Sequence, residues 1–287
     1  MAQNTRAKPL SARANPKDFQ LQITTEADSA IKLAGKTEER LNKDIRKKGA
    51  IHLTLIDPEE TTPEKVRDIA TQSECAGTSG IMVGGSTSIF VSHLDSVIEA
   101  IRSAISLPIL LFPNNVSGIS RHADAIWFMS LLNSSNPYWI IGAQALGAPL
   151  VKRLGVEAIP MGYVVVGGGG IAGLVGEAKP IPYDRPELAT MYALAGEFLG
   201  MRFIYLEAGS GADSPVPPGM IRLVRSAVSS RLVVGGGIRT AEQARLAVKS
   251  GADIVVTGTI AEKSQSPLRA LRVIVRAVEE GARLRRS

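Results

Sequence analysis

Short apolar runs recur along most of this chain, and helix-like segments separate them. The runs lack the polar alternation of half-exposed strands, and they are typical of parallel strands covered on both faces. Eight can be recognised, at 51–56, 80–83, 109–112, 125–129, 158–166, 202–206, 231–234 and 254–256. Eight strands that alternate with helices predict an α/β fold, a (β/α)8 TIM barrel, and a doubly wound open sheet is the alternative.

Proline residues mark the starts of several helix-like segments between the runs. The segments expected to be helical are 64–76, 89–105, 187–199, 217–228, 241–250 and 267–280. Only PNNVSGISRHAD separates the third run from the fourth, and this stretch has no helical period. The barrel is therefore expected to be modified, with its third crossover helix missing or replaced by extended chain.

Two regions fall outside the repeating pattern. Residues 1–36 are polar and basic, and we expect a disordered extension, followed by a single barrel domain over 37–287. Thr37 is expected to cap a short helix that Gly49 ends. The segment 167–183 contains GGGG and is interpreted as a long, flexible loop on the face where the strands end.

The basic charge is concentrated at the two ends of the chain. Residues 1–48 carry 11 Lys or Arg against 6 Asp or Glu, residues 269–287 carry 6 against 2, and the body between them carries 16 against 19. Nucleic-acid binders usually concentrate basic charge on the functional face. Here the basic charge lies at the two ends of the chain, so we expect no nucleic-acid partner. No stretch has the pattern of a signal peptide or a transmembrane anchor, which leaves only transient membrane contact. The single cysteine, Cys75, excludes an intrachain disulfide framework and indicates a cytoplasmic protein.

Glycines follow the predicted strands at three places, in GSG (209–211), LVVGGGI (232–238) and IVVTGT (254–259). A backbone amide can approach a phosphate closely only where no Cβ intervenes. TIM barrels often bind phosphate after strands seven and eight, at the carboxyl-terminal face. The three turns together predict a phosphate site there.

Two carboxylates also stand at strand ends. Glu207, in YLEAGSGA, either caps a turn or faces a reacting molecule. Asp57 ends the first strand, and Ser86 follows the second; such a sparse oxygen site suits Mg²⁺, which keeps several waters. The alternative is that Asp57 begins a turn and Ser86 caps a helix. His52 lies inside a strand and is interpreted as a hydrogen-bonded core residue.

Seven motifs, taken in order, resemble the archaeal geranylgeranylglyceryl phosphate synthases over about residues 40–280. They are HLTLIDP (52–58), IMVGGS (81–86), EAIPMGY (157–163), AKPIP (178–182), YLEAGSGA (205–212), VVGGGI (233–238) and DIVVTGT (253–259). The resemblance implies a modified TIM barrel that lacks one helix. It also implies a prenyltransferase that joins sn-glycerol 1-phosphate to geranylgeranyl diphosphate. Leu55 stands where bacterial heptaprenylglyceryl relatives have lysine, which favours the archaeal branch.

The resemblance also implies site residues. Mg²⁺ would be held by Asp57 and Ser86. Glycerol phosphate would contact Tyr205, Leu206, Glu207, Ala208, Gly209, Ser210, Gly211, Gly236, Gly237, Gly258 and Thr259. In this hypothesis Glu207 is the base that accepts the proton of the attacking hydroxyl.

Several expectations about partners stay open. The prenyl chain needs a long apolar groove, which the 167–183 loop would roof. Relatives form dimers or hexamers, so a homo-oligomer is expected, with Trp139 as a candidate subunit anchor. The alternatives for function are a related synthase that uses another prenyl chain length and a non-catalytic isoprenoid-binding barrel.

Overall fold

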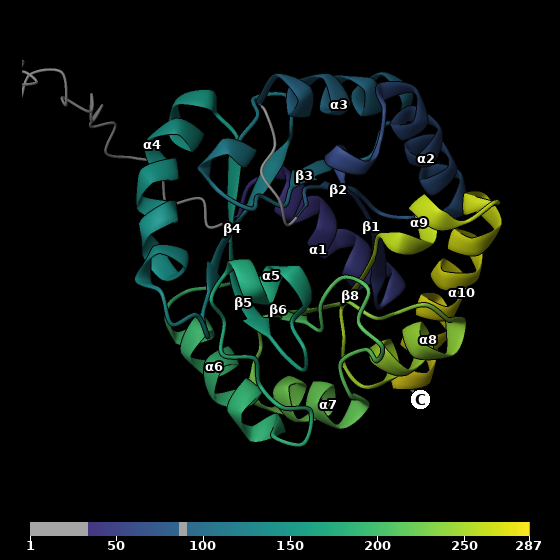
Figure 1. Ribbon diagram of the computed structural model, residues 1–287. Coiled ribbons are helices and arrows are strands. Elements are labelled where there is room, and N and C mark those ends of the chain that lie inside the picture. Colours follow the sequence, from purple (N-terminus) through teal and green to yellow (C-terminus); the bar gives the residue numbers. More distant parts are fainter. Residues whose placement is uncertain (1–33, 86–90, 287) are drawn as a thin grey trace, which may run out of the picture. The chain divides into compact units, whose positions relative to one another are not determined.

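The computed structural model describes residues 34–85 and 91–286 of the 287-residue chain. Eight parallel strands close into a barrel in the order β1 to β8, and β8 pairs with β1 (Figure 1). The strands are β1 Ile51–Ile56, β2 Ile81–Val83, β3 Ile109–Leu111, β4 Ala125–Leu131, β5 Glu157–Val165, β6 Phe203–Glu207, β7 Arg231–Gly235 and β8 Ile254–Thr257. The barrel prediction is confirmed, and the open-sheet alternative is wrong.

Helices form a ring around the strands (Figure 1). Those predicted correspond to α2 Pro63–Ala76, α3 Val91–Ala104, α6 Pro186–Phe198, α7 Pro218–Ala227, α8 Ala241–Lys249 and α10 Pro267–Arg286. Between β3 and β4 the chain forms only one 3₁₀ turn, η3 Val116–Gly118, so the missing third crossover helix is confirmed. No helix among the described residues is long and apolar enough to cross a bilayer.

Some elements were not delimited from the sequence. They are α4 Ala143–Leu154, a π-helical turn η4 Tyr138–Gly142 before it, α5 Gly170–Val175, α9 Thr259–Lys263 and a 3₁₀ turn η2 Pro58–Glu60. The helix α5 lies within the segment expected to be a flexible loop, and in Figure 1 it is drawn inside the ring of helices, next to β5 and β6.

The helix α10 continues past its predicted end at Glu280. Gly281 lies inside this helix and does not end it. The glycine allows α8 to pack closely there, since a Cβ on Gly281 would lie 2.6 Å from the Arg245 carbonyl oxygen. Farther along, the Arg285 guanidinium donates to the Ala252 carbonyl oxygen at 3.0 Å and fixes the last turn to the barrel.

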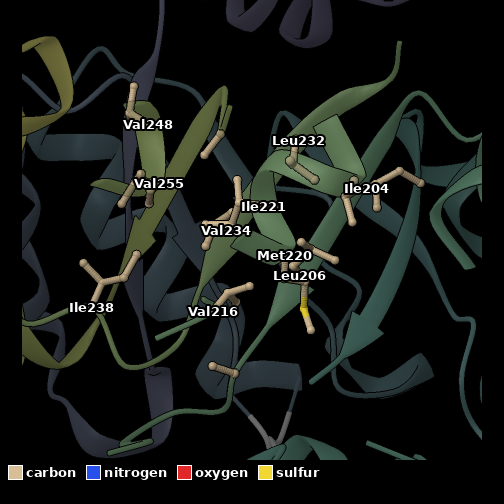
Figure 2. Close-up of a cluster of buried hydrophobic side chains, with 14 of the residues drawn as sticks. Ile204, Leu206, Val216, Met220, Ile221, Leu232, Val234, Ile238, Val248 and Val255 are labelled. Carbon is tan, nitrogen blue, oxygen red and sulfur yellow. The ribbon is translucent and has the colours of Figure 1, made fainter. Parts of the chain in front are cut away.

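Alternate residues of each strand point into the barrel and out toward the helices. On β6, Tyr205 belongs to the inner apolar cluster, and Leu206 belongs to the outer one. Figure 2 shows part of the outer cluster, where Leu206 of β6 lies beside Met220 of α7 and Val234 of β7 lies beside Ile221 of the same helix. The same alternation directs Glu207, the last residue of β6, to the inner side at the mouth of the barrel.

The helix α1 (Lys36–Lys48) packs against the barrel at the amino ends of the strands. Its Leu41 and Ile45 are buried in the inner cluster. Gly49 ends the helix as predicted, and its amide donates to the Ile45 carbonyl oxygen.

The prediction that Thr37 is the N-cap of α1 is wrong. The helix begins at Lys36, and no side chain caps it from the preceding residue. Instead the carboxylate of Glu157, at the start of β5, accepts the amides of Thr37 at 2.7 Å and Glu38 at 3.0 Å. The Glu38 carboxylate in turn accepts two hydrogen bonds of 2.6 Å from Arg202.

Glu157→Ala should lower the free energy of unfolding by about 1–2 kcal/mol, because two amides at the helix start lose their acceptor. Urea titration followed by circular dichroism measures this change. Glu279→Ala, at an exposed position on α10, is the control and should change the stability by less than about 0.5 kcal/mol. Equal effects of the two substitutions would show that Glu157 does not hold α1.

Candidate functional site

A polar pocket of about 1000 Å³, counting its open mouth, lies at the carboxyl ends of the strands. It is lined from the ends of β1, β2, β6, β7 and β8 and from α9. The predicted residues that line it are Asp57, Tyr205, Glu207, Ser210, Gly211, Gly236, Gly237, Gly258 and Thr259. The fold therefore brings together residues that lie up to about 200 positions apart in the chain, as the convergence of parallel strands predicts.

Glu207 closes a turn and also faces the pocket. It is 6% exposed, and its Oε1 accepts the Gly209 amide at 2.6 Å. A Cβ on Gly236 would touch the same Oε1, so the turn after β7 lies directly against the carboxylate. Glu207 therefore closes the turn that the sequence allowed, and its role toward a reacting molecule stays a prediction.

Burial raises the pKa of Glu207 above the ordinary value of a carboxyl group. Hydrogen bonds from the Gly209 amide and from the hydroxyls of Tyr205 and Tyr163 oppose this rise. Burial and the nearby negative charge of Glu207 also raise the pKa of both tyrosines, which keeps their hydroxyls protonated. A buried carboxylate with a raised pKa is a better proton acceptor than an exposed one.

The glycine turns need backbone conformations that side chains disfavour. The φ angle is 106° at Gly209, 74° at Gly211, 78° at Gly236 and 68° at Gly237, all in the left-handed region. Within the part of the chain that the structure describes, no protein acceptor pairs with the amides of Gly236, Gly237 or Gly258. These amides border the pocket and are available to an anion.

Two members of the implied contact set turn away from the pocket. The side chains of Leu206 and Ala208 lie in the outer apolar cluster, and Leu206 is seen there in Figure 2. The Ala208 amide already donates to the Gly235 carbonyl oxygen at 3.1 Å. Neither residue lines the pocket, because strand alternation places their side chains outward.

The interpretation of GGGG (167–170) as loop flexibility is wrong. A Cβ on Gly209 would lie 2.7 Å from the Gly170 amide nitrogen, and one on Gly170 would lie 3.2 Å from the Gly209 Cα. Glycine is needed at both positions because the start of α5 packs backbone to backbone on the turn that follows Glu207.

Asp57 lies between the ends of β1 and β2. A Cβ on Gly85 would lie 2.6 Å from its Oδ1, and the same oxygen accepts the Glu59 amide at 3.0 Å, as the turn alternative expected. Ser86, the second predicted metal ligand, lies outside the described residues. Among those described, no group of three or more His, Cys, Asp or Glu side chains is placed to hold a metal. The Asp57 carboxylate at the edge of the pocket is a suitable ligand for Mg²⁺, which keeps waters and takes phosphate oxygens as ligands.

An apolar cavity of about 880 Å³, again counting its open mouth, adjoins the polar pocket. The two share the lining residues Gly85, Phe112, Tyr163 and Ala172. The cavity extends along the connection between β3 and β4 and along α4, where the barrel lacks its third crossover helix. Its apolar lining includes Val116, Ile119, Ile126, Phe128, Val151 and Val175.

Trp139, a predicted candidate for a subunit anchor, is half-buried in the π-helical turn η4 and lines this cavity. Its ring packs edge to face on Tyr138, with 4.9 Å between the ring centroids. Its contacts within the chain therefore explain its position.

The sequence interpretation missed five polar residues of the pocket: Tyr163, Arg239, Thr257, Glu262 and Lys263. Tyr163 is on β5, and alternation from Met161 would have placed it inside the barrel. Arg239 directly follows GGGI and donates to the Gly211 carbonyl oxygen at 2.8 Å. Lys263 lies on α9, a helix too short to be recognised in the sequence.

The chain matches the PcrB family over residues 43–278, which is most of the barrel. It belongs to the PcrB family. This membership agrees with the resemblance to the geranylgeranylglyceryl phosphate synthases that the seven motifs indicated.

Several known proteins are similar to this chain along most of their length. The geranylgeranylglyceryl phosphate synthase of Methanothermobacter marburgensis is 57% identical over 232 residues, or 81% of this chain and 94% of that protein. The enzyme of the same name from Thermofilum pendens is 49% identical over 87% of this chain and 98% of its own. A crystal structure of (S)-3-O-geranylgeranylglyceryl phosphate synthase from Thermoplasma acidophilum, in complex with its substrate sn-glycerol-1-phosphate, is 42% identical. It covers 84% of this chain and 98% of its own, with a TM-score of 0.81.

Glu207→Gln should raise the melting temperature at neutral pH, because the folded state then no longer buries a charge. The pKa of Glu207 is raised in the folded protein, so its ionisation destabilises the fold above that pKa and not at lower pH. The gain should therefore shrink as the pH falls toward the ordinary carboxyl range. Differential scanning calorimetry across pH measures it, and a gain that grows on acidification would contradict the raised pKa.

Proposed function

We propose that this chain is a geranylgeranylglyceryl phosphate synthase. In this proposal it transfers the geranylgeranyl group of geranylgeranyl diphosphate to the 3-hydroxyl of sn-glycerol 1-phosphate and releases pyrophosphate. The product would contain the first ether bond of archaeal membrane lipids. One observation carries the proposal: a pocket that combines a buried carboxylate with glycine turns adjoins an apolar cavity. The names of the similar proteins in the PcrB family support it.

The acceptor phosphate would bind to the glycine turns. The amides of Gly236, Gly237 and Gly258 border the pocket, and Ser210 and Thr259 contribute to its lining. Arg239, which bridges to the Gly211 carbonyl oxygen, adds positive charge at the same edge. Holding the phosphate there fixes the distance between the glycerol 3-hydroxyl and Glu207, so that the hydroxyl is positioned before it reacts.

Glu207 would act as the general base. The glycerol oxygen forms a bond to C1 of the prenyl group as the bond from C1 to the diphosphate oxygen breaks. The hydroxyl proton passes to the Glu207 carboxylate, and pyrophosphate leaves with the bonding electrons. Proton acceptance by a positioned side chain typically contributes about 10²–10⁴-fold to the rate.

Asp57 would hold Mg²⁺ together with Ser86, and the diphosphate and water would complete the coordination. When bound there, the ion supplies positive charge that stabilises the departing pyrophosphate. The carboxylate lies at the edge of the polar pocket, and the apolar cavity begins at the neighbouring Gly85. The diphosphate end of the donor would then bind at the junction between the pocket and the cavity.

The apolar cavity would take the prenyl chain. Its walls come from the connection between β3 and β4, from β4, from α4 and from α5.

The exposed apolar face of α6, with Leu188, Met191 and Phe198, supports the further proposal that the protein forms a homo-oligomer. Light scattering from the purified full chain tests this, and a monomeric mass would refute it.

Incubation of the full chain with labelled sn-glycerol 1-phosphate, Mg²⁺ and prenyl diphosphates of several lengths tests the function. We expect the ether product, formed fastest with geranylgeranyl diphosphate, and Glu207→Gln should lower kcat by about 10²-fold or more while glycerol phosphate still binds. Faster turnover of farnesyl or heptaprenyl diphosphate would indicate a related synthase. Binding of the prenyl substrate without any product would indicate a non-catalytic isoprenoid-binding barrel.

Asp57→Asn should raise the Mg²⁺ concentration needed for half-maximal activity by about tenfold, because the neutral amide is a weaker ligand for a hard cation. Asparagine retains an oxygen that can accept the Glu59 amide, so the turn is preserved. A magnesium titration of the initial rate measures the effect. An unchanged titration curve would remove Asp57 from the metal site.

A further inference from the structure

A buried hydrogen-bond network joins β1 to the glycine turn after β8. His52 is 1% exposed, and its Nδ1 lies 2.9 Å from Thr78 Oγ1. Its Nε2 lies 2.9 Å from Thr257 Oγ1. Thr257 is the last residue of β8, and Gly258 of the glycine turn follows it directly. The ring therefore connects the start of the second βα unit with the end of the last strand.

The positions of the protons in this network follow from its hydrogen bonds. The Thr78 hydroxyl donates its one proton to the His52 carbonyl oxygen at 2.9 Å, so toward the ring it can only accept. Nδ1 therefore carries the ring proton. Burial lowers the pKa of His52 to about 3, so the ring is neutral and Nε2 is an acceptor. The Thr257 hydroxyl consequently donates to Nε2.

This contact lies at the point where the strand ladder stops. The pairing of β1 with β8 ends at Thr54 opposite Thr257, so the following turn lies beyond the last paired position. The Thr257 side chain is then a lateral tether directly before the turn. The Nε2 atom that accepts from Thr257 is held in place because both ring nitrogens of His52 are hydrogen-bonded.

We infer that His52 is a positioning residue for the binding of the acceptor substrate, sn-glycerol 1-phosphate. Through Thr257 it fixes the Gly258–Thr259 turn in the conformation that binds phosphate. The substrate named in this inference rests on the proposed function. An amide cradle has to be held to within about 0.5 Å of its working geometry, and a loose turn would weaken phosphate binding before it changed the chemistry. The proposed base, Glu207, stands on β6 and is independent of this tether.

Two substitutions of the same histidine separate this role from a general loss of stability. His52→Asn places an amide near the Nδ1 position, so it can keep the Thr78 contact but cannot reach Thr257. His52→Gln extends to the Nε2 position and can still accept from Thr257. We expect His52→Asn to raise the KM for sn-glycerol 1-phosphate about tenfold and His52→Gln to raise it less than about threefold, with similar losses in melting temperature.

A second pair changes the tether from its other end. Thr257→Val removes the hydroxyl at nearly constant volume and should reproduce the effect of His52→Asn, whereas Thr257→Ser keeps the donor and should restore a low KM. Thr54→Val is the matched control, because Thr54 joins the network through a longer contact of 3.4 Å to Thr78. In all variants kcat and the KM for the prenyl diphosphate should stay within about twofold of the starting protein.

Calorimetric binding of inorganic phosphate to the full chain separates this inference from the proposed function. If the unmodified protein forms no ether product, the proposed function fails, and the dissociation constants for phosphate still test the tether. Weaker phosphate binding in His52→Asn and Thr257→Val than in His52→Gln and Thr257→Ser supports the role. Equal dissociation constants for phosphate in His52→Asn and His52→Gln, and in Thr257→Val and Thr257→Ser, would overturn it. Equal shifts in the KM values of both substrates would also overturn it.

Discussion

Burying the carboxylate of Glu207 is the constraint on which the rest of the site depends. A charge at the mouth of a barrel is stable only if donors surround it, and here they come from the Gly209 amide and two tyrosine hydroxyls. The start of α5 packs on the Gly209 turn at backbone distance, which requires glycine at 209 and at 170. The turn that donates to the buried carboxylate therefore depends on glycines in two distant segments.

Much of the barrel could be predicted from the sequence. Parallel strands covered on both faces are short and apolar throughout, which made all eight visible, and the lost crossover helix appeared directly as a spacing too short to hold one. Features that depend on distant partners could not be predicted. Thr37 has the composition of a helix cap, yet the acceptor is Glu157, 120 positions away. The sequence GGGG (167–170) suggests a flexible loop, but Gly170 packs on Gly209, which the sequence alone does not reveal.

The site was predictable to the extent that strand ends define it. Period-two alternation places Tyr205 and Glu207 inward, and the same rule, applied to the whole YLEAGSGA motif, would have turned Leu206 outward. Arg239 and Lys263 were not predictable, because their positions depend on a turn and a very short helix. The roles of Asp57 and of its expected partner Ser86 stay predictions.

The missing crossover helix between β3 and β4 has a thermodynamic consequence. Ile126 and Phe128 face a cavity where most barrels have a helix, so a layer of the apolar core is incomplete there. A hydrocarbon tail that enters the cavity would supply that layer. Ligand binding and conformational stability would then be linked through the same surface, because only the folded chain offers it. A bound prenyl chain would then complete the apolar core, and its release would leave that part of the core unfilled.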